Sequence, residues 1–452
     1  MKIESLSPMR SESTRTEERV GGRGGKSGAM EAFPQWIILL IVVIVLSRVA
    51  ALLAGRFGLP STSIQLLIGV LLGPSVFNLL GVPMVLGTWG SPSSGPLHSA
   101  LRILAEIGLI QLMFLAGLGV DWRDLKKMLK LTFSVGAWGF LLTAVSVAII
   151  TRVFVARWSE AMAMSAIVAA PSFGISIYYF NEMKGLDSRV KVTVLGAAIS
   201  SGLLAILLMI ASQATSYAMI YGPSKMSIAV SWFLAKLIMF FAVAYFLTSR
   251  FLKLSSKSGF QKRPRQMLVG YLLLVAALYA WASMHFGSFA AIGVASAGGA
   301  LIGVSNFGLK DKIEQRFQSV LASLPIGMLF VVVGMGANLK EMGATGLFWA
   351  VLFVTVVGAK FLGCWIATRK TPELRSDRIS IAIATLPQGE MGMLVAAYLF
   401  SRGLVDPSQF NVAIIMVVLL TVIIPIAMKV VQIKLNIHAT PSLPRVKKTI
   451  VW

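Results

Sequence analysis

Two stretches rich in helix-breaking residues decide how this chain folds: AAPSFG at 169–174 and LPQGEMG at 386–392. Each lies in the middle of an apolar run that is long enough to cross a bilayer, 161–181 for the first and 379–401 for the second. Proline removes a backbone donor and glycine loosens the helix, so both runs are predicted to break near the centre of the membrane. Either stretch alone is compatible with an ordinary proline kink, but the pair favours two broken helices.

The composition places these runs in a membrane. Of the 452 residues, 56% are hydrophobic and 13% are charged, whereas soluble domains average about 45–50% and about 25%. This excludes a soluble globular enzyme, and the single cysteine, Cys364, excludes a disulfide framework. Thirteen apolar runs are predicted, near 34–54, 60–80, 101–119, 131–151, 161–181, 192–213, 227–249, 267–285, 288–305, 318–337, 344–368, 379–401 and 409–428. Residues 34–430 are therefore predicted to form one all-helical membrane domain, between a disordered tail at 1–33 and a short basic tail at 431–452.

The two broken runs are the fifth and the twelfth. Since they are seven runs apart, they cross the membrane in opposite directions, as inverted repeats require. Inverted repeats place crossed broken helices, with their exposed backbone dipoles, around an ion site near the midplane of the membrane. The pattern predicts a secondary transporter working by alternating access, rather than a channel, a receptor or an enzyme.

The distribution of basic residues predicts the orientation. If the N-terminus lies outside, the inner loops together with Arg56 hold 21 Lys and Arg, and the outer loops hold six. Because cytoplasmic loops concentrate these residues, the N-terminus is predicted outside and the C-terminus in the cytoplasm, in a plasma (inner) membrane. The same asymmetry accounts for the formal net charge of +23, so nucleic acid is not expected as a partner.

Charged residues inside the apolar runs are the most informative ones, because each must be paired or must face water. Two acids, Glu106 and Glu390, lie inside runs, and Lys360 lies in mid-run in VVGAKFLGCW. Glu106 is near the end of its run and is interpreted as a structural tie. Glu390 follows the second break, and for both Glu390 and Lys360 a structural and a functional role remain open.

Four motifs follow one another along the chain: LAEIGLIQLMFLAGLGVD at 104–121, the segment 171–207 with the first break, VGAKFLG at 357–363, and LPQGEMGMLVAAYLFSRGLV at 386–405. In this order they resemble cation:proton antiporters of the Kef and sodium/hydrogen exchanger type, over roughly residues 35–430. The resemblance implies a panel of helices, a core domain with two crossed broken helices, and a homodimer in membrane lipid. It also implies exchange of a monovalent cation, Na⁺ or K⁺, for protons, with no cofactor and no resident metal.

One position departs from the family pattern. Where the resemblance implies ion-binding acids, the chain has Ser200 and Ser201. A carboxylate holds either a proton or a cation, whereas a serine hydroxyl ligates a cation but stays neutral. Glu390 is therefore predicted to supply the titratable group, with Lys360 nearby. The candidate ion-binding and translocation residues are Glu390, Lys360, Ser200, Ser201, Ser172 and Gln388.

Two other functions remain open at this point. A membrane lysine beside neutral serines would suit an anion or an organic solute as the cargo. The loss of the acids would also fit a regulatory relative that transports nothing. Proton flux measured with a panel of cations and anions separates the three.

Overall fold

The computed structural model describes residues 27–57, 60–79, 96–119, 122–154, 157–173, 176, 188–222, 323–340, 346–369, 371 and 377–434, with isolated positions between 227 and 246. All regular structure in these ranges is helical, as the composition predicts. The predicted runs at 267–285 and 288–305, and most of the run at 227–249, lie outside the described residues.

The helices of the first half are α1 (Ser27–Phe57), α2 (Ser61–Leu72), α3 (Pro96–Gly119), α4 (Trp122–Lys127), α5 (Leu129–Phe154), α6 (Trp158–Ala169) and α8 (Ser188–Tyr221). Those of the second half are α13 (Ser323–Met335), α14 (Gly346–Thr368), α15 (Arg378–Ala384), α16 (Glu390–Ser401) and α17 (Pro407–Lys434). Within the described ranges, α1, α5, α8, α14 and α17 are long and apolar enough to cross a membrane.

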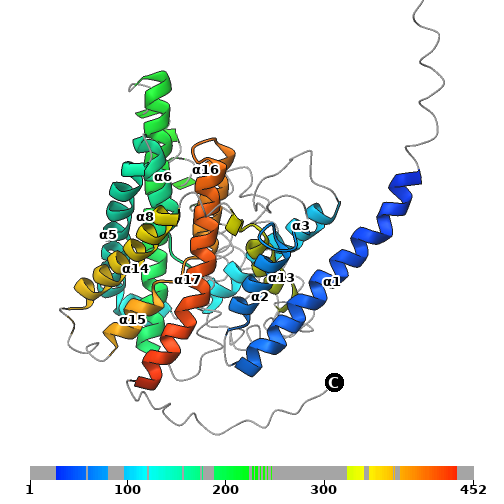
Figure 1. Ribbon diagram of the computed structural model, residues 1–452. Helices are drawn as coiled ribbons and strands as arrows, with labels where there is room; N and C mark the ends of the chain where they lie inside the picture. The colour runs from blue at the N-terminus through cyan, green and yellow to red at the C-terminus, as the bar shows by residue number, and fades with distance from the viewer. Residues whose placement is uncertain are drawn as a thin grey trace, which may run out of the picture.

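The helices form two groups, with α16 and α17 between them (Figure 1). One group holds α1, α2, α3 and α13, and the other holds α5, α6, α8 and α14. Helix α17 contacts both groups, because it packs on α2 as well as on α6 and α15. The most extensive pairing joins α5 to α14, which are the fourth and the eleventh predicted runs and therefore equivalent members of the inverted repeat.

Glycine permits the closest crossings between these helices. A Cβ atom at Gly363 of α14 would stand 2.5 Å from the carbonyl oxygen of Trp138 on α5. In the other group, Gly69 of α2 and Gly334 of α13 face each other, and a Cβ on either would meet the backbone of the opposite helix. Helices in lipid associate through close packing of small residues, so these glycines set how near the helices approach.

Several helix boundaries differ from the predicted runs, and two of the differences have a local cause in the sequence. Helix α1 begins at Ser27, inside the stretch 1–33 that was assigned to the tail, because Ala-Met-Glu-Ala at 29–32 favours a helix. Helix α2 ends at Leu72 rather than near residue 80. Pro74 cannot continue the helix, and residues 73–79 form turns in which the Gly73 N–H donates to the carbonyl of Gly69 (2.9 Å).

Candidate ion site

Both predicted helix breaks are present. Helix α6 ends at Ala169, and residues 170–173 leave the helical conformation. On the other side, α15 ends at Ala384, and a non-helical segment that runs to Gly389 precedes α16. Each break leaves backbone groups without helical partners, so each needs other contacts.

The two breaks contact each other directly. The backbone N–H of Ser172 donates to the carbonyl of Pro387 (3.2 Å). The side-chain amide of Gln388, which is 1% exposed, donates to the carbonyl of Val168 in the last turn of α6. The free carbonyl and N–H groups of one break are thus satisfied by the other, which accounts for the crossing of two interrupted helices inside the bundle.

Hydrogen bonds from α17 and α2 also hold the second break in place. The Thr421 hydroxyl on α17 donates to the backbone carbonyl of Gln388 (2.9 Å). In turn, the Ser63 hydroxyl of α2 donates to the carbonyl of Thr421 (3.0 Å). A chain of hydrogen bonds therefore runs from α2 through α17 and Gln388 to the end of α6.

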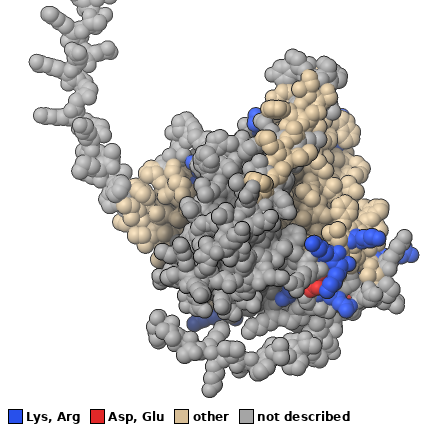
Figure 2. Space-filling view, turned by 180° about the vertical axis from the view of Figure 1, so that it is seen from behind, with Lys and Arg blue, Asp and Glu red and all other residues tan. Residues whose placement is uncertain are grey.

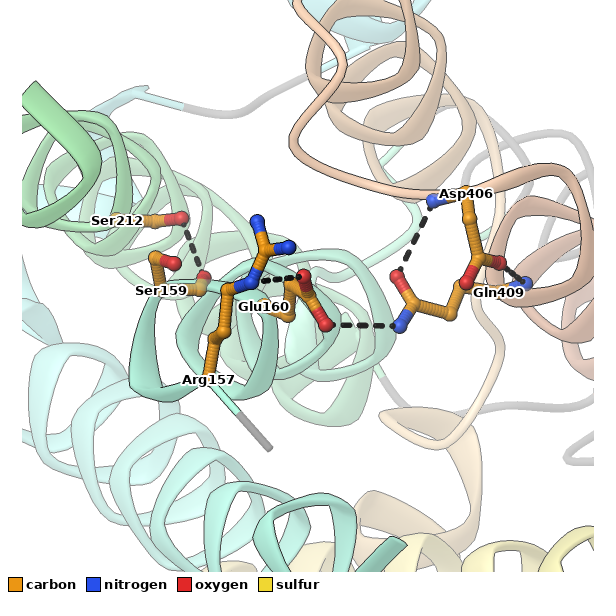
Figure 3. A network of polar contacts seen from close by, with 6 residues as sticks. All are labelled: Arg157, Ser159, Glu160, Ser212, Asp406 and Gln409. Atoms are coloured by element: carbon orange, nitrogen blue, oxygen red, sulfur yellow. Dashed lines mark hydrogen bonds and ion pairs between the residues drawn. The ribbon is translucent and has the colours of Figure 1, made fainter. Parts of the chain in front are cut away.

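A polar network holds the N-terminal ends of α6 and α17 together (Figure 3). Glu160 lies 3.5 Å from Arg157 Nε, and its other carboxylate oxygen accepts a hydrogen bond from the Gln409 side chain (3.5 Å). Asp406 accepts the Gln409 backbone N–H (2.8 Å), and the Ser212 hydroxyl of α8 donates to the carbonyl of Ser159 (2.8 Å). The network fixes the half-helix α6 relative to both α8 and α17.

A small cavity lies beside the first break, among α5, α6, α8, α14 and the end of α15. Its volume is about 20 Å³, which is enough for a water molecule. The lining residues are Val135, Gly136, Gly139, Phe140, Pro171, Ser172, Ser176, Val194, Ala197, Ala198, Ser201, Lys360, Cys364 and Thr385. Three of the predicted site residues, Ser172, Ser201 and Lys360, are therefore brought together.

Lys360 is the charged residue of this lining. It is 3% exposed, and its Nζ makes no hydrogen bond to any described residue. An ammonium group that is buried without a partner is costly, so this position needs either an anion or carboxylate beside it or a route for losing its proton. Cys364, one turn further along α14, is held by the Thr385 hydroxyl (3.0 Å).

The two serines at the departure from the family pattern point in different directions. The Ser201 hydroxyl donates to the carbonyl of Ala197 (2.6 Å) and lines the cavity. The Ser200 hydroxyl is not part of the lining and lies against α5, within 3.4 Å of the Thr132 carbonyl. A hydroxyl that donates to a carbonyl keeps its lone pairs, so Ser201 offers the cavity an acceptor suited to a cation.

The two acids inside the predicted runs have different surroundings. Glu390 is the first residue of α16, directly after the second break, and its side chain lies outside the described part of the structure. Glu106 lies on α3, where its carboxylate is 3.9 Å from Arg102 Nε, and it is not among the residues that line the cavity. This arrangement agrees with its interpretation as a structural tie.

Several lining residues were not predicted as site residues. Ser176 comes four residues after Ser172, and its hydroxyl donates to the Ser172 carbonyl (2.6 Å). Thr385 directly precedes the second breaker stretch. Both are hydroxyl residues next to a break, and this signal is visible in the sequence. Thr421 carries no such signal, because only the packing of α17 brings it to Gln388.

Comparison with known proteins gives one consistent family. The family model described as the transmembrane domain of sodium/hydrogen exchangers matches residues 40–432. Among characterised relatives, the Na⁺/H⁺-K⁺ antiporter GerN of Bacillus cereus is 23% identical over 397 residues, which is 87% of this chain and 96% of GerN. The Na⁺/H⁺ antiporter of Enterococcus hirae is 23% identical over 395 residues, which is 87% of this chain and 97% of that protein.

A solved structure gives the same architecture. The sodium proton antiporter MjNhaP1 of Methanocaldococcus jannaschii superposes with a TM-score of 0.64 at 17% sequence identity. The match covers 90% of this chain and 99% of that one. The predicted fold class, a polytopic helical membrane protein with two crossed broken helices, is thereby confirmed.

Proposed function

This chain belongs to the sodium/hydrogen exchanger family of membrane transporters, and on that premise we propose that it exchanges a monovalent cation, Na⁺ or K⁺, for protons by alternating access. The observation that carries the proposal is the cavity at the crossed breaks, with a buried lysine and hydroxyl oxygens in its wall. The antiport activities named for the relatives support the same exchange.

The hydroxyl groups in the cavity wall bind the cation in this proposal. Ser172, Ser176 and Ser201 bring three of them to the cavity, and Thr385 brings a fourth. Hydroxyl and carbonyl oxygens are hard ligands, which alkali-metal cations prefer to nitrogen or sulfur. Gln388 and Ser200 act from outside the lining, where Gln388 holds the crossing and Ser200 fixes α8 against α5.

Lys360 and Glu390 bind and transfer the proton in this proposal. An ammonium group and a metal cation in one small cavity repel each other strongly, because the surroundings screen them poorly. The cation therefore enters as Lys360 gives up its proton, and the return of the proton expels the cation. Glu390, at the start of α16, is the carboxyl group that passes this proton between Lys360 and the aqueous side that the site faces, in place of the acids missing at Ser200 and Ser201.

The remaining features of the proposal concern assembly and orientation. We place the protein as a homodimer in a plasma (inner) membrane, with the N-terminus outside and the C-terminus in the cytoplasm. The asymmetry of 21 against six basic residues supports this orientation. We keep the transmembrane domain at about 34–430 between tails at 1–33 and 431–452, with α1 reaching back to Ser27 and α17 running on to Lys434.

One observation favours a second candidate function. Lys360 is the charged member of a lining that is otherwise neutral or apolar, and a lone ammonium with hydroxyls around it would also attract a small anion or an organic acid. In that case the anion is the cargo, and cations have no effect on proton movement. A relative that transports nothing would show neither effect.

The purified protein in sealed liposomes, with a pH-sensitive dye inside, decides between these functions. Additions of NaCl, KCl and LiCl at constant chloride test the cations, and sodium salts of chloride, acetate and lactate at constant sodium test the anions. Antiport predicts proton movement that follows the cation and ignores the anion. Proton movement that follows the anion, or none above protein-free liposomes, contradicts the proposal.

A further inference from the structure

Basic side chains gather where α4 ends and α5 and α8 begin. Lys126 and Lys127 end α4, Lys130 is in the first turn of α5, and Arg189 and Lys191 are in the first turn of α8. Lys126, Lys127, Lys130 and Arg189 are exposed. Figure 2 shows a blue cluster of Lys and Arg on this face of the molecule, with little red among it. We call these five residues the basic patch.

Most of the lysine charge of the basic patch is not neutralised by acids of the described residues. Asp124 lies 3.2 Å from Lys127, but an exposed pair of this kind contributes little. In the described part of the chain, no ion pair engages Lys126 or Lys130. The patch therefore presents several positive charges at one end of two membrane-spanning helices.

An apolar stripe continues from the basic patch along α5. Leu129 and Phe133 are 58% and 56% exposed, and Leu141 and Val145, 49% and 56% exposed, continue the exposed apolar surface along the helix in steps of eight and four residues. Lys130 precedes Phe133 by three residues on α5, so it lies on that side of the helix, and Lys126 stands at the end of α4, just before α5 begins. Lysines followed by an exposed apolar stripe are complementary to a phospholipid, whose headgroup would contact the lysines and whose acyl chain would lie along the stripe.

The basic patch is mechanically linked to the candidate ion site. Leu125 of α4 is 5% exposed and packs on α8, where a Cβ at Gly196 would stand 2.6 Å from its Cδ1 atom. Thr132 of α5 touches the same glycine, and its carbonyl accepts the Ser200 hydroxyl. Gly196 precedes Ser200 by one helical turn, so a ligand that holds α4 in place also steadies the turn of α8 that carries the two serines.

We propose that the basic patch is a binding site for the phosphate headgroup of an anionic phospholipid, whose acyl chain lies along Phe133, Leu141 and Val145. The site is at the end of α5 and α8 that the charge asymmetry places at the cytoplasmic leaflet, where anionic lipids are concentrated. Binding there does not depend on which ion the protein transports. Each lysine near such a surface contributes about 1 kcal/mol to binding.

Native mass spectrometry and thermal unfolding of the purified full-length protein test the site. The titrant is phosphatidylglycerol in detergent micelles, with phosphatidylcholine of the same chains as the neutral lipid. The double variant Lys126→Gln/Lys130→Gln removes two charges of the patch, and Lys340→Gln, an exposed lysine after α13, is the matched control. Glycerol phosphate and inorganic phosphate at equal ionic strength separate a lipid site from a site for any phosphate.

Phosphatidylglycerol should bind the wild type and Lys340→Gln equally, and raise the unfolding temperature of both. The double variant should bind it about thirtyfold more weakly, with the temperature shift lost. Equal binding by the double variant, an equal effect of phosphatidylcholine, or full reproduction of the shift by free phosphate would each overturn the proposal. Transport activity is not part of this readout, so failure of the proposed antiport leaves the lipid result interpretable.

Discussion

The two halves of the inverted repeat have the same architecture but different chemistry. Helices α5 and α8 and the break that follows α6 supply the neutral wall of the cavity, including Ser172 and Ser201. Helix α14 supplies its charge, Lys360, and α15 ends beside it at Thr385. Helix α17, the counterpart of α8, supplies no lining residue and instead anchors the second break through Thr421. The repeated fold thus preserves the crossing, while the two halves supply different groups: serine hydroxyls from the first, and the lysine together with the anchor of the second break from the second.

The largest expected effect tests whether the second half carries the proton. Lys360→Met and Glu390→Gln should each abolish cation-driven proton flux in liposomes. Lys360→Met should also raise the unfolding temperature, because it removes a buried charge that has no partner among the described residues. Unaltered coupling in Glu390→Gln would exclude Glu390 as the replacement for the missing acids.

The crossing of α5 and α14 offers the next largest effect. In Gly363→Ala the new methyl group meets the Trp138 backbone, and overpacking of this kind destabilises by about 1–3 kcal/mol. Gly358→Ala on the same helix is the control, because a Cβ there has no atom within 4 Å. Thermal unfolding in detergent should show a loss for Gly363→Ala and no loss for Gly358→Ala. Equal stability of the two variants would mean that the α5–α14 crossing is looser than described.

Replacing Ser200 or Ser201 by aspartate tests which of these two residues of α8 faces the candidate site. Ser201→Asp places a carboxylate in the cavity wall that also holds Lys360. It should stabilise the protein, because a hydrogen bond between charged groups contributes about 1.5–3 kcal/mol. Ser200→Asp directs the acid towards the Thr132 carbonyl and Gly136, so it should destabilise the protein. Unfolding temperatures of the two variants should move in opposite directions. Stabilisation by Ser200→Asp alone would place Ser200, rather than Ser201, at the site.

The smallest expected effect distinguishes a residue that anchors the second break, Thr421, from one that is proposed to bind the cation, Ser176. Thr421→Val removes the hydrogen bond to the Gln388 carbonyl and should lower stability by about 0.5–1.5 kcal/mol. Ser176→Ala removes a hydroxyl from the cavity and should weaken the dependence on cation concentration with little change in stability. Thr355→Val is a control for the substitution itself, since the Thr355 hydroxyl bonds only within its own helix. If Thr421→Val changed the cation dependence and left the stability unchanged, Thr421 would contribute to cation binding and not to anchoring the second break.

The sequence by itself determined the fold class and the position of both breaks. Apolar runs of about 20 residues have one solution in a bilayer, the helix, and proline with glycine at 171–174 and 386–392 has few alternatives to interrupting it. The pairing of runs five and twelve then follows from their spacing, and the same spacing relates α5 to α14. Residues of the breaker motifs that meet at the crossing, such as Ser172 and Gln388, could therefore be named without a structure.

Only the tertiary structure decided which of those residues share a cavity. Ser200 and Ser201 are adjacent in sequence, but successive residues of a helix point about 100° apart, so one faces α5 and the other the cavity. Thr421 and Ser63 are 358 residues apart, yet a hydrogen bond joins them and supports the second break. The local pattern of residues sets where helices begin, break and end, whereas side-chain contacts between distant segments arise only when the helices pack.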